Sequence, residues 1–387
     1  MGCTRTISGL LPKNIPLRAM NKGFGILFWF LPWLMPLLGQ EGPPRVRNLD
    51  LNPFYGSVLL HNPDISHLIR EHPAGFILGW NRKTFGAEAW EERYGYPDQG
   101  ISFVYQDMGT PTLGQNYGLY LHYNFYFWKR NLQLRIGQGV AYNTNPYDRT
   151  GNFRNNAYGS HLMSSTYLMF QFHRERIWNR LGFHAGLALV HYSNANVRAP
   201  NTSTNTLGLT AGLIYELGKD PQQDYEYRKW PKESIREGVR VNLVFRSGIN
   251  ESDVVGSGQF PFYILSAYAD KRLGVVSAIH AGTEVYFSNF LKELIRFQSN
   301  SFPELEVEPN ADFKRVGIMV GHELFINKLT VLAQLGYYVY YPFDFEGRVY
   351  NRIGIKRYFG PRWFGAISLK SHGAKAEALE FGVGIRL

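Results

Sequence analysis

The sequence predicts an all-β protein, a transmembrane antiparallel β-barrel with an even number of strands, about 14 to 16. First, segments of roughly ten residues with alternating polarity recur from about residue 55 to the last residue, with turn residues between them. Second, aromatic residues make up 16% of the chain and gather at the ends of these segments, as in barrels that cross a membrane interface. Third, a mean hydropathy of −0.25 is too polar for a bundle of membrane helices.

Each predicted strand has the period of two residues that separates the faces of a sheet. In 116–129, for example, Leu119, Leu121 and Phe125 share one face, and His122 and Asn124 share the other. We expect the apolar face to meet lipid and the polar face to line the interior. The strands are predicted near 55–62, 75–83, 100–107, 116–129, 132–142, 164–175, 181–193, 205–217, 238–247, 260–271, 275–288, 313–326, 328–341, 348–358, 362–372 and 376–387.

The connections between the predicted strands alternate in length, as they do in barrels with short periplasmic turns and long outer loops. The long connections are 143–163, 194–204 and 289–312, and all three fall on the outer side when the C-terminus is periplasmic. The segment 218–237 is the exception, because it is long yet falls on the periplasmic side. The strands therefore form either one barrel or an eight-stranded unit followed by a second strand set.

The chain divides into five predicted regions. Residues 1–40 combine basic residues, an apolar run and a small-residue end, which is typical of an export signal. Met20 is a more usual start for such a signal, so residues 1–19 are an expected extension from a mis-assigned start codon. The apolar run is shorter than the roughly 20 residues of a spanning helix. The remaining regions are a linker at 41–54, a strand unit at 55–217, a periplasmic excursion at 218–237 and a second strand unit at 238–387.

Composition excludes several classes of function. The single cysteine, Cys3, lies within the predicted signal, so the mature chain has no thiol chemistry and no disulfide. The histidines lack metal-ligand spacing, and no nucleotide motif is present, so no metal or cofactor is expected. The formal charge of +10 comes without a nucleic-acid motif, so anionic lipid headgroups are the expected partner and nucleic acid is not. The sequence leaves the oligomeric state open.

The run His191-Tyr-Ser193-Asn194-Ala195 carries the clearest chemical signal. It ends an alternating strand, so His191 and Ser193 continue the apolar, lipid-facing row of Leu187 and Leu189. A serine is a useful nucleophile only beside a base that a third group holds in place. The count of connections puts this pair at the outer end of its strand, where lipid headgroups and ester bonds lie. Asn205 falls on the lipid-facing row of the next strand, and Asn194 has an amide able to donate to an oxyanion.

These residues, followed by Pro200-Asn201, resemble the active-site segment of the outer-membrane lipid A 3-O-deacylases, the PagL-like barrels. The resemblance implies an eight-stranded unit over about 55–217 and hydrolysis of the 3-position ester of lipid A. It also implies serine as nucleophile, histidine as base and the following asparagine in the oxyanion site, roles that carry over to Ser193, His191 and Asn194. Residues 218–387 are not covered by the resemblance.

One position departs from the family pattern, because the family has a glutamate where this chain has Asn205. An amide orients an imidazole but does not neutralise an imidazolium, and an acid-to-amide change in one serine protease lowers kcat about 10⁴-fold. Asp148, the sole acid in 143–163, is a candidate substitute, although it also suits a plain turn.

The predicted function is therefore an outer-membrane serine esterase that acts on lipid A or lipopolysaccharide. The alternative is an outer-membrane channel or transporter of hydrophobic ligands, since about sixteen strands in one barrel would enclose a wide lumen. In the C-terminal strands, alternation places His372 and Glu380 in the lumen and Glu377 on the opposite face, which predicts no second site there.

Overall fold

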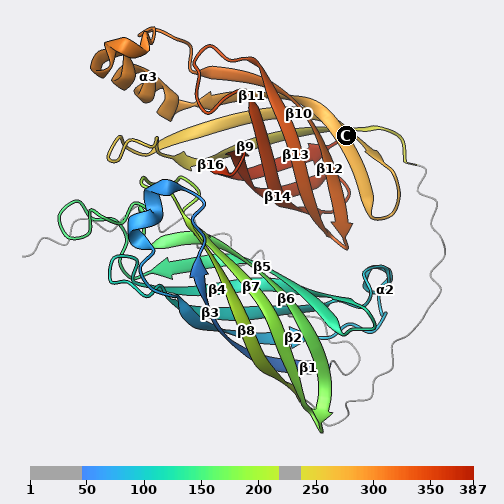
Figure 1. The fold of residues 1–387 in the computed structure, drawn as a ribbon. Helices are drawn as coiled ribbons and strands as arrows, with labels where there is room; N and C mark the ends of the chain where they lie inside the picture. The colour runs from blue at the N-terminus through green and yellow to red at the C-terminus, as the bar shows by residue number, and fades with distance from the viewer. Residues whose placement is uncertain (1–45, 218–236) are drawn as a thin grey trace, which may run out of the picture. The chain divides into compact units, whose positions relative to one another are not determined.

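The computed structural model describes residues 46–217 and 237–387. These described residues form sixteen antiparallel strands, three short helical elements and one longer helix, α3. The strands close into two separate eight-stranded barrels, β1 to β8 and β9 to β16, each drawn in Figure 1 as a continuous wall of arrows. The even number of strands is confirmed. The sequence left open whether the strands form one barrel or two units, and the structure has two barrels. The predicted signal and most of the predicted excursion at 218–237 lie outside the described residues.

In the first barrel β1 pairs with both β2 and β8, which closes the wall. Its elements are β1 (Arg47–Val58), η3 (Pro63–Leu68), β2 (Ala74–Arg82), α2 (Ala89–Arg93), β3 (Asp98–Asp107), β4 (Gln115–Phe127), β5 (Leu132–Asn143), β6 (Leu162–Trp178), β7 (Leu181–Ser193) and β8 (Thr204–Leu217).

In the second barrel β9 pairs with both β10 and β16. Its elements are β9 (Arg240–Asn250), β10 (Phe260–Arg272), β11 (Ser277–Ser288), α3 (Asn289–Ser301), η4 (Pro303–Leu305), β12 (Lys314–Ile326), β13 (Leu329–Tyr340), β14 (Val349–Phe359), β15 (Trp363–His372) and β16 (Lys375–Arg386). Within the described part of the chain, no helix has the length and apolar character needed to cross a membrane.

The first strand begins at Arg47, within the segment predicted as a linker at 41–54. Asp50, Asn52 and Pro53 suggest a turn by composition, but Asp50 and Asn52 point into the barrel and are buried. Pro53 is paired opposite Phe76 and accepts a hydrogen bond from Thr210 through its carbonyl. Residues 47–54 of the predicted linker therefore belong to the first strand, and its polar side chains face the polar interior.

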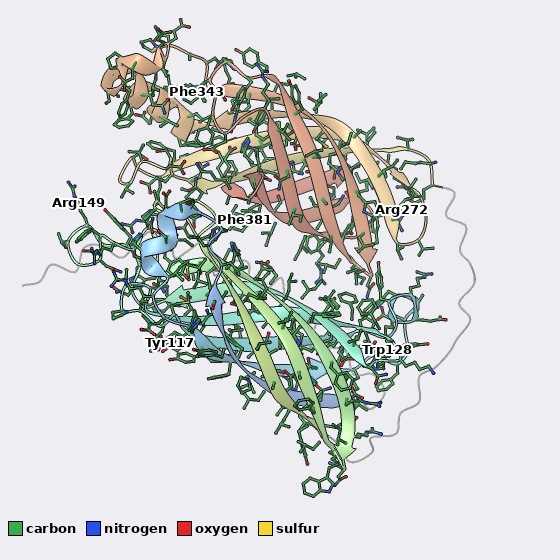
Figure 2. The ribbon with its side chains drawn as sticks, in the orientation of Figure 1. Tyr117, Trp128, Arg149, Arg272, Phe343 and Phe381 are labelled. Atoms are coloured by element: carbon green, nitrogen blue, oxygen red, sulfur yellow. The ribbon has the colours of Figure 1, made fainter. Side chains whose placement is uncertain are left out.

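Apolar side chains point outward and polar side chains point inward in both barrels, the reverse of a water-soluble barrel. On β7 and β8 the outward Leu187 and Leu209 are 45% and 72% exposed, whereas the inward His184 and Thr206 are fully buried. Figure 2 shows Tyr117 and Trp128 standing out from opposite ends of β4. This inversion is the property of a barrel that crosses a membrane.

The interior of the first barrel is filled by side chains. Arg135 donates to both carboxylate oxygens of Asp50, at 2.9 and 2.6 Å, and to Asn124 at 2.7 Å. All three are buried, so the charged pair is satisfied rather than solvated. An eight-stranded barrel has room for such side chains and little else.

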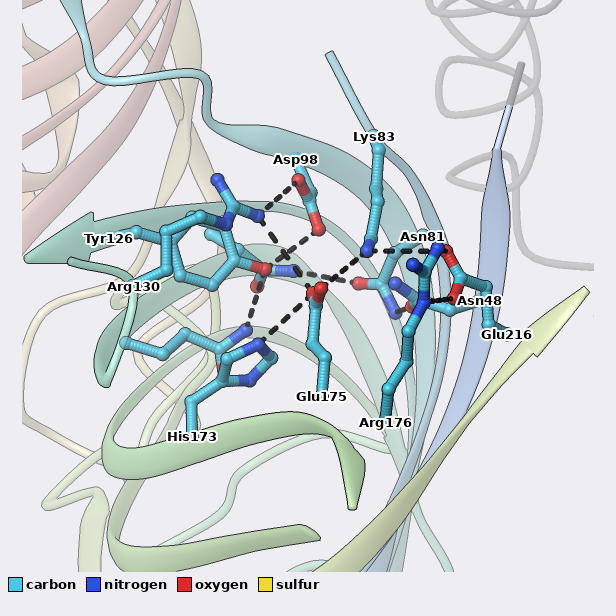
Figure 3. Close-up of polar contacts among 12 residues, drawn as sticks. Asn48, Asn81, Lys83, Asp98, Tyr126, Arg130, His173, Glu175, Arg176 and Glu216 are labelled. Atoms are coloured by element: carbon cyan, nitrogen blue, oxygen red, sulfur yellow. Dashed lines mark hydrogen bonds and ion pairs between the residues drawn. The ribbon is translucent and has the colours of Figure 1, made fainter. Parts of the chain in front are cut away.

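The short-turn end of the first barrel is closed by a second set of charges, drawn in Figure 3. Lys83 contacts Glu175 at 2.6 Å and Glu216 at 3.5 Å, and Arg176 donates to Glu216 at 2.6 Å. Lys83 belongs to the connection between β2 and β3, which includes α2 and is long although it lies at the short-turn end. The alternation of loop lengths therefore has a second exception that the sequence analysis did not single out.

The interior of the second barrel has its own ion-pair network. Arg352 lies between Glu284 and Glu380, with contacts of 2.8 and 2.6 Å, and all three are buried. Close to the two-residue connection 373–374 between β15 and β16, Glu377 also points inward and contacts His372 at 2.7 Å. The predicted opposite orientation of Glu377 is wrong, because a register shift after Lys370 inserts an extra residue into β16.

Candidate active site

The candidate site lies where β7 ends at Ser193 and β8 begins at Thr204. His191 is paired with Asn205 on β8 and with Thr166 on β6. Its neighbours in the sequence, Val190 and Tyr192, are fully buried in the interior. His191 and Ser193 therefore share the row opposite to these interior residues; His191 is partly exposed there, whereas Ser193 is buried, at 5% exposure. They also lie at the end of β7 away from its short turn at 179–180.

His191 is oriented by the neighbouring strand. Its Nδ1 lies 2.8 Å from Oδ1 of Asn205. Because an amide oxygen only accepts hydrogen bonds, Nδ1 carries the proton and Nε2 has its lone pair available. The predicted third group thus meets the predicted base, in the tautomer that a general base requires.

Ser193 shares the outward row with His191, but its hydroxyl has other partners. The Oγ donates to Oδ1 of Asn201 at 3.1 Å and accepts from the backbone N–H of Ala195 at 3.0 Å. The hydroxyl is therefore directed toward the loop 194–203 rather than toward His191. The pair is adjacent on one face, and transfer of the serine proton requires the hydroxyl to rotate.

Asn194 follows the serine at the start of the same loop. Its backbone N–H donates to Oδ1 of Asn201 at 2.9 Å, and its side-chain amide donates to the carbonyl of Arg198 at 2.5 Å. Both groups able to stabilise an oxyanion thus have a partner within the loop. The Asn194 side-chain oxygen is buried and has no hydrogen-bond partner among the described residues.

Asn201 is the residue to which sequence reasoning assigned no role. Its side-chain oxygen accepts from both the Ser193 hydroxyl and the Asn194 N–H. The rest of the loop is fastened by backbone bonds from Thr202 and Ser203 to the neighbouring outer loop. The only sequence signal for this role is that Asn201 lies a few residues after Ser193. Its contact with Ser193 depends on how the loop 194–203 folds back, which the sequence pattern does not show.

Asp148 is not part of this arrangement. Its Oδ1 accepts from Thr150 and from the backbone N–H of Gly151 at 2.7 Å, all within its own exposed turn. The hydrogen bonds from Gly151 and Thr150 hold the pKa of Asp148 below its ordinary value. The carboxylate stabilises a turn, and the structure gives His191 the amide of Asn205 as its partner instead.

No group of three or more histidine, cysteine or acidic side chains is placed to hold a metal ion in residues 46–217 and 237–387. The described site itself offers a hydroxyl, an imidazole and amides. These are the groups that hydrolyse an ester by nucleophilic attack.

Comparisons with individual known proteins identify structural matches of low sequence identity. No curated protein matches the chain. Solved structures that match include an engineered porin of Rh. blastica, at 10% identity and a TM-score of 0.18, and another variant of that porin at 9% and 0.16. Each comparison covers 88% of this chain and 99% of the porin chain.

Family models match both barrels. The model described as lipid A 3-O-deacylase (PagL) matches residues 74–214, within the strand unit that carries the resemblance. The model described as acyloxyacyl hydrolase, C-terminal domain, matches residues 239–387, the part that sequence reasoning left unexplained. Ser193 and His191 lie inside the first match, and the two matches together cover most of the chain. The chain belongs to the PagL family of lipid A deacylases.

Proposed function

We propose that this protein is a serine esterase of the outer membrane that removes an ester-linked acyl chain from lipid A, with Ser193 as the nucleophile. Family membership supports lipid A deacylation, and the serine mechanism is proposed for this chain from the resemblance of its His191–Ala195 segment. The observation that carries the proposal is that His191, held by Asn205, lies on the apolar outer row of β7 with Ser193 two residues on, although Ser193 itself is 5% exposed beside the loop 194–203. A substrate dissolved in the membrane reaches that face and not the interior.

In the proposed first step the Ser193 hydroxyl turns from Asn201 to Nε2 of His191. The oxygen attacks the ester carbonyl as its proton moves to Nε2. The imidazolium that forms keeps its Nδ1–H bond to Asn205. The carbonyl oxygen becomes an oxyanion, which the backbone N–H of Asn194 stabilises once Asn201 no longer occupies it.

In the second step the sugar hydroxyl leaves with the proton from Nε2, and the fatty acyl group stays on Ser193. Water then attacks the acyl-enzyme, with His191 again accepting a proton, and releases the fatty acid. We assign the cleaved bond to the 3-position ester by analogy with the family description. Asn205 serves as a positioning residue that acts through His191.

The channel alternative rested on the wide lumen of a single barrel of about sixteen strands. The sixteen strands form two barrels of eight rather than one wide barrel. Arg135 and Asp50 in the first interior, and Arg352 with Glu284 in the second, occupy the space that a water-filled lumen requires.

The proposal is tested with purified full-length protein, refolded in detergent and incubated with lipopolysaccharide. We expect release of a hydroxy fatty acid, measured by gas chromatography with mass detection, and none from Ser193→Ala. Ser164→Ala is the matched control, since Ser164 is paired with Ser193 on β6 and undergoes the same truncation. Release retained by Ser193→Ala would remove Ser193 as the nucleophile.

A further inference from the structure

The outer wall of the second barrel has a depression on four consecutive strands, β10 to β13. Cross-strand register places two outward rows side by side. One row is Lys271, Ile279, His322 and Ala333, and the other is Ala269, Ala281, Val320 and Leu335. These side chains line an open cavity of about 740 Å³. That volume lies within the about 300–1,000 Å³ of typical small-molecule sites.

The shape of this groove follows from side-chain size. Alanine occupies positions 269, 281 and 333, while Val320 and Leu335 are 59% and 56% exposed and stand higher along one side. The small methyl group of an outward alanine leaves a gap between larger neighbouring side chains. A flexible acyl chain can fill such a gap and gain van der Waals contacts. The groove is therefore an open apolar slot across the four strands, with Ala269 and Ala281 side by side on β10 and β11 and Ala333 in the neighbouring row on β13.

A hydrogen-bonded pair of polar side chains lies at the short-turn end of the groove. Nε2 of His322, which lines the groove, lies 2.7 Å from Oγ of Ser277, and both residues face outward. Lys271, at the same end, is exposed and contacts the backbone carbonyl of Glu237 at 2.7 Å. An ammonium group, an imidazole and a hydroxyl at one end of an apolar slot complement an amphiphile with an acyl tail and a phosphate head.

We propose that this groove binds one glycerophospholipid, with an acyl chain over Ala269 and Ala281 and its phosphate at Lys271 and His322. This assignment rests on the membrane orientation of the proposed function, which puts the short-turn end of the barrel in the periplasmic leaflet, where glycerophospholipid is found. The site is separate from Ser193, which belongs to the other barrel and to the opposite end of its own strand. The Ser277 hydroxyl fixes the orientation of the His322 ring.

The test is native mass spectrometry of the full-length protein in a neutral detergent, titrated with phosphatidylglycerol. We expect one tightly bound lipid, and about tenfold weaker binding for the double variant Ala281→Leu and Ala333→Leu, whose larger side chains fill the slot. Ala267→Leu is the matched control, because it makes the same change on the outward row of β10 outside the groove. Lys271→Gln tests the head end and is expected to weaken binding about tenfold without altering the slot.

Equal binding by the double variant and by Ala267→Leu would overturn the proposal, as would tighter retention of added lipid A than of phosphatidylglycerol. Deacylation of lipopolysaccharide is measured on the same samples, and we expect the groove variants to match the unmodified protein. Absent deacylation with groove-dependent lipid binding would count against the esterase alone. Normal deacylation with unchanged lipid binding would count against the groove alone.

Discussion

The amide of Asn205 offers the most informative perturbation, because the family has an acid there and this chain does not. Its oxygen lies 2.8 Å from Nδ1 of His191 and already selects the reactive tautomer. The about 10⁴-fold loss seen in a serine protease with an acid-to-amide change reflects the wrong tautomer. That part of the loss does not apply here, so the amide lacks only the negative charge.

We therefore expect Asn205→Asp to raise kcat by about tenfold. A hydrogen bond to a charged group contributes about 1.5–3 kcal/mol and a neutral one about 0.5–1.5 kcal/mol, so the gain for the imidazolium is about 1–1.5 kcal/mol. That free energy corresponds to about a tenfold rate change. Asn205→Ala removes the bond and the orientation, and we expect kcat to fall by about tenfold to a hundredfold.

The assay is initial-rate release of fatty acid from lipopolysaccharide by the refolded full chain. Gln138→Glu is the matched control, since Gln138, Thr166, His191 and Asn205 are consecutive partners across four strands. It makes the same amide-to-acid change about 10 Å from His191, two strand spacings away. An unchanged or lower kcat for Asn205→Asp, or an equal rise for Gln138→Glu, would refute the reasoning.

Three further outcomes follow from the structure. Asn201→Ala should raise kcat by a few fold, because it removes the acceptor that the Ser193 hydroxyl and the Asn194 N–H must both leave, while Asn145→Ala in another outer loop should not; a lower rate would show that Asn201 positions the serine for attack. Asp148→Asn should leave the rate within about twofold, since the carboxylate bonds only its own turn, and a tenfold loss would restore it as the acid. Arg135→Met should cost about 3–5 kcal/mol of unfolding free energy in a urea titration by stranding the charge of Asp50, whereas the exposed Arg149→Met should cost none; a stable Arg135→Met would show that the pair is dispensable.

The period of two residues was enough to predict all sixteen strands, because an apolar face and a polar face impose it on every strand. The start of β1 was placed too late, because Asp50 and Asn52 are turn formers by composition, although the alternation with Leu49 and Leu51 holds there. The period failed at Glu377, since alternation does not reveal the extra residue that turns this side chain inward. Closure as two barrels depends on the pairings of β1 with β8 and of β9 with β16, which are contacts between distant segments.

The candidate site was predictable to the extent that it lies on strands. His191, Ser193 and Asn205 follow from alternation and from register between neighbouring strands. The contacts of Asn201 and the turn around Asp148 depend on loop conformation, which no periodicity encodes. The groove on the second barrel also escaped prediction, because it requires the register of four strands at once.

The central claim is that the hydroxyl of Ser193 is the nucleophile. The most direct measurement is covalent labelling of the refolded protein with a long-chain alkyl fluorophosphonate, followed by peptide mapping. The account predicts a single adduct on Ser193 that is lost in His191→Ala. An adduct on another serine, or active protein in which Ser193 stays unmodified, would contradict it.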